Sequence, residues 1–470
     1  MNLSHAWRIT SGDVVAFVGG GGKTTAMFLL ANELAPQMRV LTTTTTRIFA
    51  AQIKRSPAHV SFNPAQQSLA DILPLLDDAI ARHGQVLLIG QADPASGKAF
   101  GLPPEIIDSL AASSHFDVIL NEADGSRMRP LKAPAAHEPV IPAATTLVVP
   151  VVGLDVLGRP LGDDTVHRAE LVSQLTGTVL GQPVTPDTVA ALLCHPDGGL
   201  KHIPAQARVA PLLNKVDWKS TGLEGWKSGR LEDGKARLEY LEAAREIAGN
   251  LLACERVDAV VIGAVQQAAS PVVEVHSRVA AVILAAGGST RFGSPKQLAR
   301  WGDKTFIEQV VDSALDSEAS PVVVVLGAEV EQCRALLRSR PVEIVVNPAW
   351  AEGQSTSMQA GLASLPANVG GALFLLVDLP GVTPALLDEL IQRHRETLAP
   401  LVWPEVEGQR GNPVLFDWAL FPELRQIRGD TGGRPLLLKY KDQAERVWVA
   451  EAGILRDFDR PEDLAAFGLG

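Results

Sequence analysis

Two glycine-rich segments constrain the fold more than any other feature of this sequence. One occupies positions 19–22 and the other positions 287–288, and each directly follows a short run of β-branched residues, at 14–18 and 279–284. A buried strand that ends in such a loop is typical of parallel α/β sheets, which bind ligands at the carboxyl ends of their strands. Because glycine has no side chain, the backbone N–H groups of these loops can approach phosphate oxygens closely. Two such units in one chain predict two α/β domains.

The rest of the chain supports this organisation. Its length of 470 residues exceeds what a single hydrophobic core usually serves. Short β-branched runs alternate with longer amphipathic stretches, which is the pattern of parallel sheets covered by helices. We expect one domain at 1–270 and a second at 278–470. The joint is expected within 267–277, where Gln, Ala, Ser and Pro interrupt the pattern.

The periodicity also predicts individual elements. In the first domain it predicts helices at 24–35, 104–112 and 231–253, and strands at 14–18, 39–42, 86–89, 117–120, 147–152, 209–213 and 259–262. In the second domain it predicts helices at 305–316 and 355–365, and strands at 279–284, 321–326, 342–346 and 372–377.

Composition and charge argue against several classes of function. The net charge of −11 and the lack of a Lys/Arg block argue against a nucleic-acid partner. The three cysteines, Cys194, Cys254 and Cys333, lie far apart in the sequence and form no CxxC pair, so we expect them to be buried or inert. No apolar run approaches the roughly 20 residues needed to span a bilayer, so we expect a cytoplasmic protein without a membrane partner.

The second glycine segment has the chemistry of a triphosphate site. The residues concerned are Leu284, Ala285, Ala286, Gly287, Gly288, Ser289, Arg291 and Lys296. Their backbone N–H groups could cradle phosphate oxygens, while the two cations add fixed positive charge. The alternative is a glycine-rich connection with two solvated cations.

Two carboxylates are candidates for binding Mg²⁺ beside that triphosphate. Asp378 ends the apolar run 374–377, so its carboxylate is expected at the same sheet edge as the glycine segment. Asp459 is a second candidate. Each has an alternative, since Asp378 could cap the turn before Pro380 and Asp459 could precede a simple helix start.

This domain resembles the MobA-like nucleotidyltransferase family, whose signature of Leu-Ala-Ala-Gly, a small residue, Arg and then Lys matches residues 284–296. The likeness continues through further segments at 350–358, 374–380, 410–415, 429–434 and 457–463. Within the family, the closest pattern is that of molybdenum cofactor cytidylyltransferase. The resemblance implies a Rossmann-like, GT-A-like sheet. It also implies transfer of the cytidylyl group of CTP to the phosphate of molybdopterin, with release of pyrophosphate.

In such a reaction catalysis is largely positional, with cations neutralising the charge that develops on the phosphates. We expect Arg291, Lys296 and Asp378 to act catalytically. Polar residues in the other matching segments, Ser355, Ser357 and Asn412, would orient the base or the pterin, or else form turns. The sequence departs from the family pattern around Asp378 and at Phe292. These departures leave the choice between CTP and GTP open.

In the first domain, the glycines Gly19, Gly20, Gly21 and Gly22 precede Lys23, Thr24 and a predicted helix. Strand, loop and helix in this order are the context of a P-loop, in which Lys23 would reach the β- and γ-phosphates and Thr24 would bind Mg²⁺. A full P-loop has glycine where this chain has Phe17, so the loop is a shortened variant. The run of threonines at 42–46 could also face a phosphate, or form a plain turn.

Two later segments fit a nucleotide site in this domain. Glu122 and Asp124 follow the predicted strand 117–120, where a metal ligand is expected, and we favour Asp124. Asn214 and Asp217 belong to an Asn-Lys-Val-Asp segment that resembles the guanine-reading element of nucleotide-binding proteins. GTP or ATP is therefore the nucleotide expected at this site.

The first domain resembles the accessory family of selenium-dependent molybdenum hydroxylases, the YqeC-like family. The likeness rests on the segments 18–24, 122–126, 132–134, 137–139, 166–168 and 214–217. It implies a P-loop-NTPase-like α/β domain that serves the maturation of a molybdenum hydroxylase of the xanthine dehydrogenase type. The histidines in these segments, His137 and His167, are more typical of hydrogen-bonded loop residues than of metal ligands.

The leading hypothesis is therefore a molybdenum cofactor cytidylyltransferase fused to a nucleotide-binding accessory domain. A guanylyltransferase, or a reductase on the same scaffold, is the enzymatic alternative for the second domain. The triphosphate chemistry of Arg291, Lys296 and Asp378 argues against the reductase. A non-catalytic, GTP-gated delivery module is the alternative for the first domain.

Overall fold

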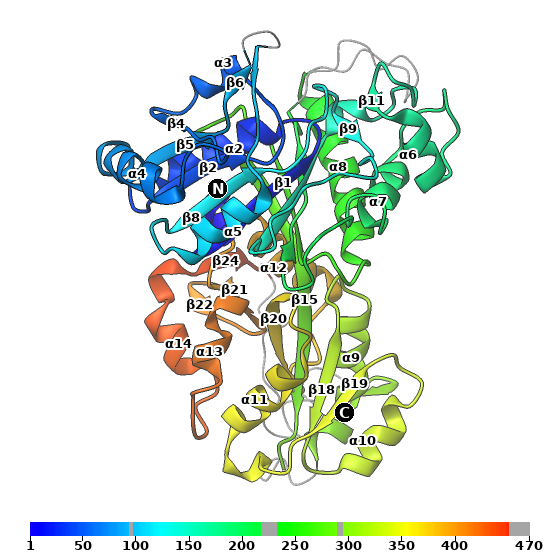
Figure 1. Cartoon of the computed structure of the whole chain (residues 1–470). Helices are drawn as coiled ribbons and strands as arrows, with labels where there is room; N and C mark the ends of the chain where they lie inside the picture. Colours follow the sequence, from blue (N-terminus) through cyan, green and yellow to red (C-terminus); the bar gives the residue numbers. More distant parts are fainter. Residues whose placement is uncertain (94–96, 218–232, 289–294, 451–470) are drawn as a thin grey trace. The chain divides into compact units, whose positions relative to one another are not determined.

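The computed structural model describes residues 1–93, 97–217, 233–288 and 295–450. These residues form two compact units, Met1–His276 and Ser277–Gly470, which we call the N-terminal and C-terminal units. Each unit contains its own sheet with helices packed on it (Figure 1). The predicted mixed α/β class is therefore confirmed. No helix in the described ranges is both long and apolar enough to cross a bilayer.

The sheet of the N-terminal unit is parallel and centres on β1 (Asp13–Gly19), which lies between β8 (Val118–Glu122) and β10 (Leu147–Gly153). The strands beyond β8 are, in order, β2 (Val40–Thr44), β5 (Gln85–Ile89) and β4 (His59–Ser61). Those beyond β10 are β12 (Arg208–Val209), β13 (Leu212–Asn214) and β14 (Ala259–Gly263). Because the chain goes from β1 towards β2 on one side while β10 lies on the other, the carboxyl end of β1 is a topological switch point, where α/β sheets bind ligands.

Helices cover this sheet, and two small sheets lie outside it. The helices are α1 (Leu3–Ala6), α2 (Lys23–Leu34), α3 (Ala50–Ile53), α4 (Leu69–His83), α5 (Pro104–Ala112), η1 (Leu154–Val156), α6 (Ala169–Thr176), α7 (Pro186–Cys194) and α8 (Asp233–Leu252). In one small sheet β7 (Lys98–Ala99) lies between β3 (Ile48–Phe49) and β6 (Ala92–Asp93), and in the other β9 (Leu131–Lys132) pairs with β11 (Val166–His167). The central strands are buried on both faces, which explains their continuous runs of β-branched residues.

In the C-terminal unit the sheet centres on β15 (Val272–Ala285). On one side, β15 pairs in parallel with β18 (Val322–Leu326), which pairs with β19 (Glu343–Val346). On its other side lies β20 (Val369–Leu376), followed by the antiparallel β23 (Val414–Asp417), then β21 (Leu401–Val406) and β24 (Glu445–Trp448). The parallel strands β15 and β20 end side by side, with Leu284 opposite Leu376.

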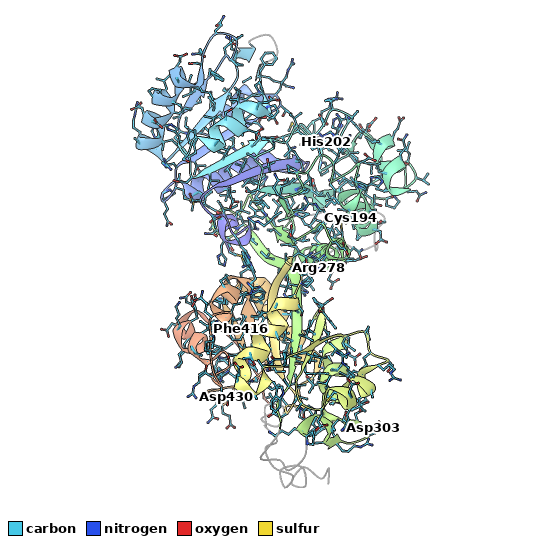
Figure 2. All side chains as sticks on the ribbon, turned by 60° about the horizontal axis from the view of Figure 1, so that its bottom comes forward. Cys194, His202, Arg278, Asp303, Phe416 and Asp430 are labelled. Carbon is cyan, nitrogen blue, oxygen red and sulfur yellow. The ribbon has the colours of Figure 1, made fainter. Side chains whose placement is uncertain are left out.

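The helices of this unit are η2 (Lys296–Leu298), α9 (Phe306–Leu315), α10 (Val330–Leu337), η3 (Trp350–Glu352), α11 (Gln354–Ser364), α12 (Pro384–Thr397), η4 (Trp418–Leu420), α13 (Phe421–Leu424), α14 (Arg434–Lys439) and η5 (Lys441–Gln443). Short strands β16 (Arg300–Trp301) and β17 (Lys304–Thr305) form a hairpin, and β22 (Gln409–Arg410) extends β21. Apolar side chains pack on both faces of the sheet. Phe374 and Phe416 meet edge to face with 5.6 Å between ring centroids, and Figure 2 shows Phe416 inside this unit.

The predicted helices and strands are confirmed, with ends that differ by a few residues. Two predictions need correction. The run 209–213 forms two short strands because Pro211 lies between them and has no N–H to donate. Residues 272–277, predicted as part of the joint, already belong to β15. Helices α4, α6, α7, α10 and α12 and the short helices α1, α3, α13 and α14 were not predicted.

We expect Ile391→Ala to destabilise the C-terminal unit by about 2–5 kcal/mol, since Ile391 on α12 is fully buried and its truncation leaves a cavity. Urea unfolding of the whole chain measures this as a lower transition midpoint. Glu389→Ala, an exposed change on the same helix, is the control and should stay within about 0.5 kcal/mol. An equal effect of both changes would contradict the described packing.

Candidate functional site

The glycine segment of the C-terminal unit borders a cavity of about 560 Å³ at the carboxyl ends of β15 and β20. We call it the donor cavity. Its lining includes Leu284, Ala286, Gly287, Gly288, Lys296, Gln297, Trp350, Glu352, Gln354, Ser357, Asp378 and Asp430. The side chain of Gln297 is buried and fixes the segment, because its amide donates to the carbonyls of Ala285 (2.9 Å) and Gly287 (2.7 Å).

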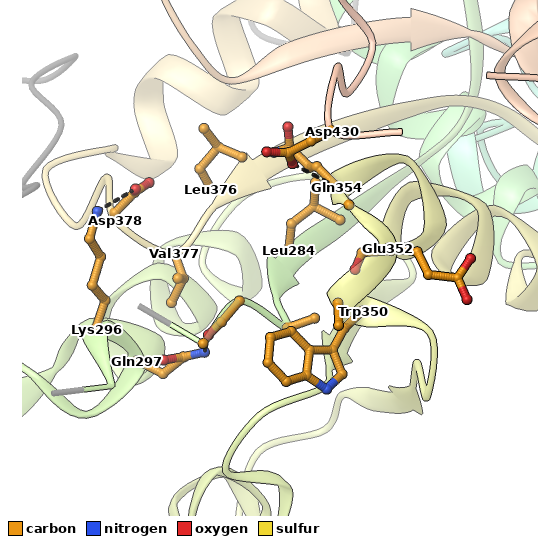
Figure 3. A pocket seen from close by; sticks show the side chains of 16 residues that line it. Leu284, Lys296, Gln297, Trp350, Glu352, Gln354, Leu376, Val377, Asp378 and Asp430 are labelled. Carbon is orange, nitrogen blue, oxygen red and sulfur yellow. Dashed lines mark hydrogen bonds and ion pairs between the residues drawn. The ribbon is translucent and has the colours of Figure 1, made fainter. Parts of the chain in front are cut away.

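Lys296 and Asp378 face each other on one side of the donor cavity (Figure 3). The ammonium of Lys296 lies 3.1 Å from Oδ2 of Asp378, and both residues are largely shielded from solvent. Asp378 follows β20, so the sheet brings together a cation and a carboxylate that are 82 positions apart in the chain. The other expected participants, Ser289, Arg291 and Asp459, lie outside the described residues.

Trp350 borders the other side of the donor cavity and packs closely on two glycines. A Cβ on Gly288 would lie 3.0 Å from the indole ring, and one on Gly327 would lie 2.5 Å from it. Nearby, the backbone N–H of Gln354 donates to Asp430 over 3.1 Å (Figure 3). Trp350 and Asp430 lie in segments that carry the family resemblance, but the sequence alone assigned neither residue a role.

The donor set fits a divalent cation at Asp378. Its Oδ1 is buried and has no hydrogen-bond partner among the described residues. The described residues contain no cluster of three or more His, Cys, Asp or Glu that could hold a metal alone. Mg²⁺ is commonly held by one or two carboxylates together with substrate phosphates, so a single protein carboxylate is compatible with it.

A second cavity of about 640 Å³ adjoins the first, and we call it the acceptor cavity. Leu284, Gln354 and Leu376 line both cavities. Apolar side chains such as Phe374 and Trp403 line the acceptor cavity together with the neutral Asn412 and four cations, Arg410, Arg434, Lys441 and Arg446, of which Arg446 pairs with Glu405 in the same lining. Asn412 therefore lies in the acceptor cavity and is not among the residues that line the donor cavity.

The two serines expected to orient a ligand differ in position. Ser357 lines the donor cavity and accepts a hydrogen bond from Asn347 over 3.0 Å. Ser355 is buried on α11 and lines neither cavity. The expectation that its side chain orients a ligand directly is therefore corrected. Helix α11 starts at the cavity and immediately buries this side chain in its first turn.

In the N-terminal unit, the glycine loop borders a cavity of about 710 Å³, which we call the N-terminal cavity. A Cβ on Gly21 would lie 2.1 Å from the backbone nitrogen of Gly153, and Gly21 has a φ of +74°, so only glycine fits there. The N–H groups of Gly19, Gly20 and Gly21 already donate to protein acceptors. The donors left for a phosphate are therefore the first N–H groups of α2, from Gly22 onwards, which have no intrahelical partner.

The acid beside the loop is Glu122, which corrects the preference for Asp124. Thr24 donates to Oε2 of Glu122 over 2.7 Å, and Glu122 lines the N-terminal cavity. Burial raises the pKa of this carboxyl, while Lys23 and Thr24 act in the opposite direction. Asp124 does not line that cavity, and its carboxylate lies within 3.2 Å of the ammonium groups of Lys23 and Lys132.

The segment predicted to read guanine has a different position from the one expected. The amide of Asn214 donates to the carbonyl of Gly21 (2.7 Å) and accepts from the N–H of Val265 (3.1 Å), so this side chain ties the loop to the end of β14. Asp217 is not among the residues lining the cavity, and Gln267 donates to it over 2.6 Å. The carboxylate of Asp217 therefore lacks the expected place beside a bound base.

The threonine run 42–46 is mainly structural. The hydroxyls of Thr42, Thr43, Thr44 and Thr45 donate to backbone carbonyls of neighbouring segments. Only Thr46 lines the N-terminal cavity. Similarly, His137 and His167 belong to no metal-binding cluster among the described residues.

Parallel strands that end in a glycine segment, with a cation and a carboxylate beside the cavity, are typical of the class of α/β nucleotide-binding enzymes. Family models match both units: the YqeC protein family at residues 15–170 and the MobA-like NTP transferase domain at residues 281–444.

Individual relatives match each unit separately. The uncharacterized protein YqeC of Escherichia coli (strain K12) is 36% identical over 43% of this chain and 75% of its own length. Nicotine blue oxidoreductase of Paenarthrobacter nicotinovorans is 31% identical over 40% of this chain and 91% of its own length. The crystal structure of Rv0371c from Mycobacterium tuberculosis H37Rv is 26% identical and covers 40% of this chain and 96% of that chain, with a TM-score of 0.38.

The chain belongs to the YqeC protein family through its N-terminal part and to the MobA-like NTP transferase family through its C-terminal part. Its C-terminal unit is accordingly a nucleotidyltransferase domain.

We expect Glu138 to make the N-terminal unit sensitive to acid. Burial alone would raise the pKa of Glu138, but Lys132 and Arg168 lower it from 4.5 to about 2. A lowered carboxyl pKa contributes stability that is present above the unfolded value of 4.5 and lost as pH falls towards 2. Urea unfolding at a series of pH values should therefore show Glu138→Gln to be less stable at pH 7, with a smaller loss between pH 4.5 and 2.

The matched control is Glu105→Gln, because Glu105 is exposed and its side chain has no ion pair among the described residues. A Glu138→Gln variant that loses stability with pH as steeply as the wild type would contradict the expectation.

Proposed function

We propose that the C-terminal unit transfers the cytidylyl group of CTP to the phosphate of molybdopterin and releases pyrophosphate. The observation that carries the proposal is the pair of adjoining cavities, one holding Lys296 and Asp378 beside the glycine segment and the other lined in part by cations. The first suits a triphosphate, and the second suits a flat ligand with an anionic end. Their shared residues, Leu284, Gln354 and Leu376, lie where the two substrates would meet.

The reaction is a substitution at the α-phosphorus of CTP. An oxygen of the acceptor phosphate forms a bond to this phosphorus, and the bond to the oxygen bridging to the β-phosphate breaks, so that pyrophosphate leaves. Lys296 neutralises charge that develops on the phosphates, and the N–H groups of Gly287 and Gly288 hold the triphosphate. Asp378 would hold Mg²⁺, whose charge assists the departure of pyrophosphate.

The cations that line the acceptor cavity support an anionic acceptor. Arg410 and Arg434 can bind a phosphate through several donors, and Lys441 adds a further charge. Trp403 and Phe374 provide apolar surface in the same cavity, which suits a ring system such as a pterin. A molybdenum cofactor product would then serve a hydroxylase of the xanthine dehydrogenase type.

Two alternatives remain for this unit. A guanylyltransferase would use the same phosphate chemistry and differ only in base recognition. An oxidoreductase is the second candidate, because one relative that spans nearly the whole unit is named nicotine blue oxidoreductase. Measuring pyrophosphate release and nicotinamide cofactor oxidation in parallel separates transfer from reduction.

For the N-terminal unit we propose nucleotide binding in the service of cofactor delivery. Thr24 and Glu122 lie beside the N-terminus of α2, an arrangement suited to a magnesium nucleotide. The nucleotide is GTP or ATP, and the unit acts as an NTPase or as a nucleotide-gated module.

We expect the purified protein with Mg²⁺ and molybdopterin to consume CTP in preference to GTP, with pyrophosphate as product. Asp378→Asn should lower kcat about 100-fold or more, because the variant loses the carboxylate that anchors the cation. Asp303→Asn, a change at an exposed position of the same unit, should keep full activity. Greater consumption of GTP would reject the cytidylyl assignment, and an active Asp378→Asn would place the cation elsewhere.

We also expect Lys23→Ala to abolish nucleotide binding by the N-terminal unit without affecting pyrophosphate release from CTP, because the two glycine segments lie in separate units. Titration with each of the four triphosphates, with circular dichroism as a check of folding, measures this. If maturation of the target enzyme fails in cells while nucleotide turnover is unchanged, the module is favoured over the NTPase.

A further inference from the structure

The N-terminal cavity contains more positive charge than a magnesium nucleotide on the glycine loop requires. Its lining includes two acids, Glu122 and Glu138, and seven cations, of which Lys23 and Lys215 pair with Asp124 and Asp155 outside the lining. The other five cations are Arg47, Arg55, Lys98, Arg127 and Arg168. Its volume of about 710 Å³ lies in the upper part of the range of about 300–1,000 Å³ usual for ligand sites. Charge and volume together leave room for a second anionic ligand.

Arg127 is an exposed cation at the wall of this cavity, available to such a ligand. It forms no hydrogen bond or ion pair with any other described residue, although it lines the cavity. Arg127 and its neighbour Met128 both have positive φ angles, of +50° and +63°. Such backbone angles are unfavourable for residues other than glycine and cluster at binding sites. The loop is fixed from both sides, since Arg129 accepts from Gly21 and Lys132 donates to Gly125.

Arg168 adds a second cation to the same part of the lining. Its Nη1 donates to the carbonyl of Ala133 (2.8 Å) and to Glu138 (2.9 Å), while its Nε and Nη2 have no partner in the described parts of the chain. Glu138 also accepts from Lys132 over 2.7 Å, so two cations share this one carboxylate. The arrangement leaves guanidinium donors of Arg168 available to a ligand.

His167 reports the electrostatic character of this region. Burial, the largest cause, and the neighbouring Arg168, Lys132 and Arg127 together lower its pKa to about 4, against the opposing effect of Glu138. His167 is therefore neutral at physiological pH and can donate one N–H. A neutral ring beside two arginines is a donor set that suits a phosphate dianion.

We propose that Arg127, His167 and Arg168 form a second anion subsite in the N-terminal cavity, which takes the terminal phosphate of a ligand distinct from the nucleotide. This proposal depends on the proposed nucleotide site in one respect only, namely that the nucleotide lies at the glycine loop and the subsite beside it. It gives the N-terminal unit a second substrate or effector, namely a small phosphorylated molecule or inorganic phosphate.

The test follows the His167 ring by NMR in the full-length protein labelled at histidine, with His167→Gln to assign the signal. Inorganic phosphate and glycerol 3-phosphate are titrated separately, each in the presence of saturating Mg²⁺ and GDP or ADP. An anion against the ring stabilises its protonated form, so we expect either probe to raise the pKa of His167 from about 4 towards 6.5. A response to both probes indicates a monoester ligand, and a response to phosphate alone indicates the free ion.

The variant Arg127→Ala should weaken phosphate binding about 10- to 100-fold, as expected for the loss of a charged hydrogen-bond donor. Lys54→Ala is the matched control, because Lys54 is exposed in the same unit and does not line the cavity. Arg168→Gln provides a second, independent variant with the same expected direction.

Three results would overturn the proposal. The His167 signal could ignore both probes, or the Arg127 and Arg168 variants could bind phosphate as tightly as Lys54→Ala. A non-hydrolysable triphosphate could also shift His167 by itself and block the probes, which would assign these residues to the γ-phosphate. If the protein binds no nucleotide but phosphate still shifts His167 through Arg127, the subsite stands and the proposed nucleotide site fails.

Discussion

Both candidate sites depend on glycines whose backbone lies so close to neighbouring groups that little or no room is left for a side chain. In the N-terminal unit a side chain at Gly19 or Gly21 would collide with the backbone of β10, at 2.5 Å from Val151 and 2.1 Å from Gly153. In the C-terminal unit a side chain at Gly288 would press against the indole of Trp350. Parallel strands end at one edge of the sheet, and only loops without side chains can turn tightly enough there to leave a cavity beside the strand ends.

The features that could be predicted are those that depend on residues close together in the sequence. The strands, the glycine segments and the helices that follow them have local signals, so their positions are confirmed within a few residues. Pairings across the sheet have no such signal. Asp124 is paired with Lys23 and Lys132, and without these contacts the sequence gives no reason to prefer Glu122. The burial of Ser355 follows from the packing of α11, which the sequence does not reveal. Likewise, the roles of Trp350 and Asp430 depend on which loops meet at the ends of β15 and β20.

The two units use charge in different ways. Around the donor cavity, Lys296 pairs with Oδ2 of Asp378, while Oδ1 of the same carboxylate has no hydrogen-bond partner among the described residues. In the N-terminal unit, Lys23, Lys132, Asp124 and Glu138 form a connected network that is almost fully shielded from water. Buried networks of this kind are stable only when each member keeps its partners, so a change at one position affects all the others.

The donor and acceptor cavities share part of their lining, which has a consequence for the departure of a large product. A molecule that reaches across Leu284, Gln354 and Leu376 is attached at both ends, and detaching one end leaves it tethered by the other at high local concentration. In the proposed reaction, pyrophosphate would occupy only one end and would be free to leave first. The joined product would then depart slowly, after pyrophosphate.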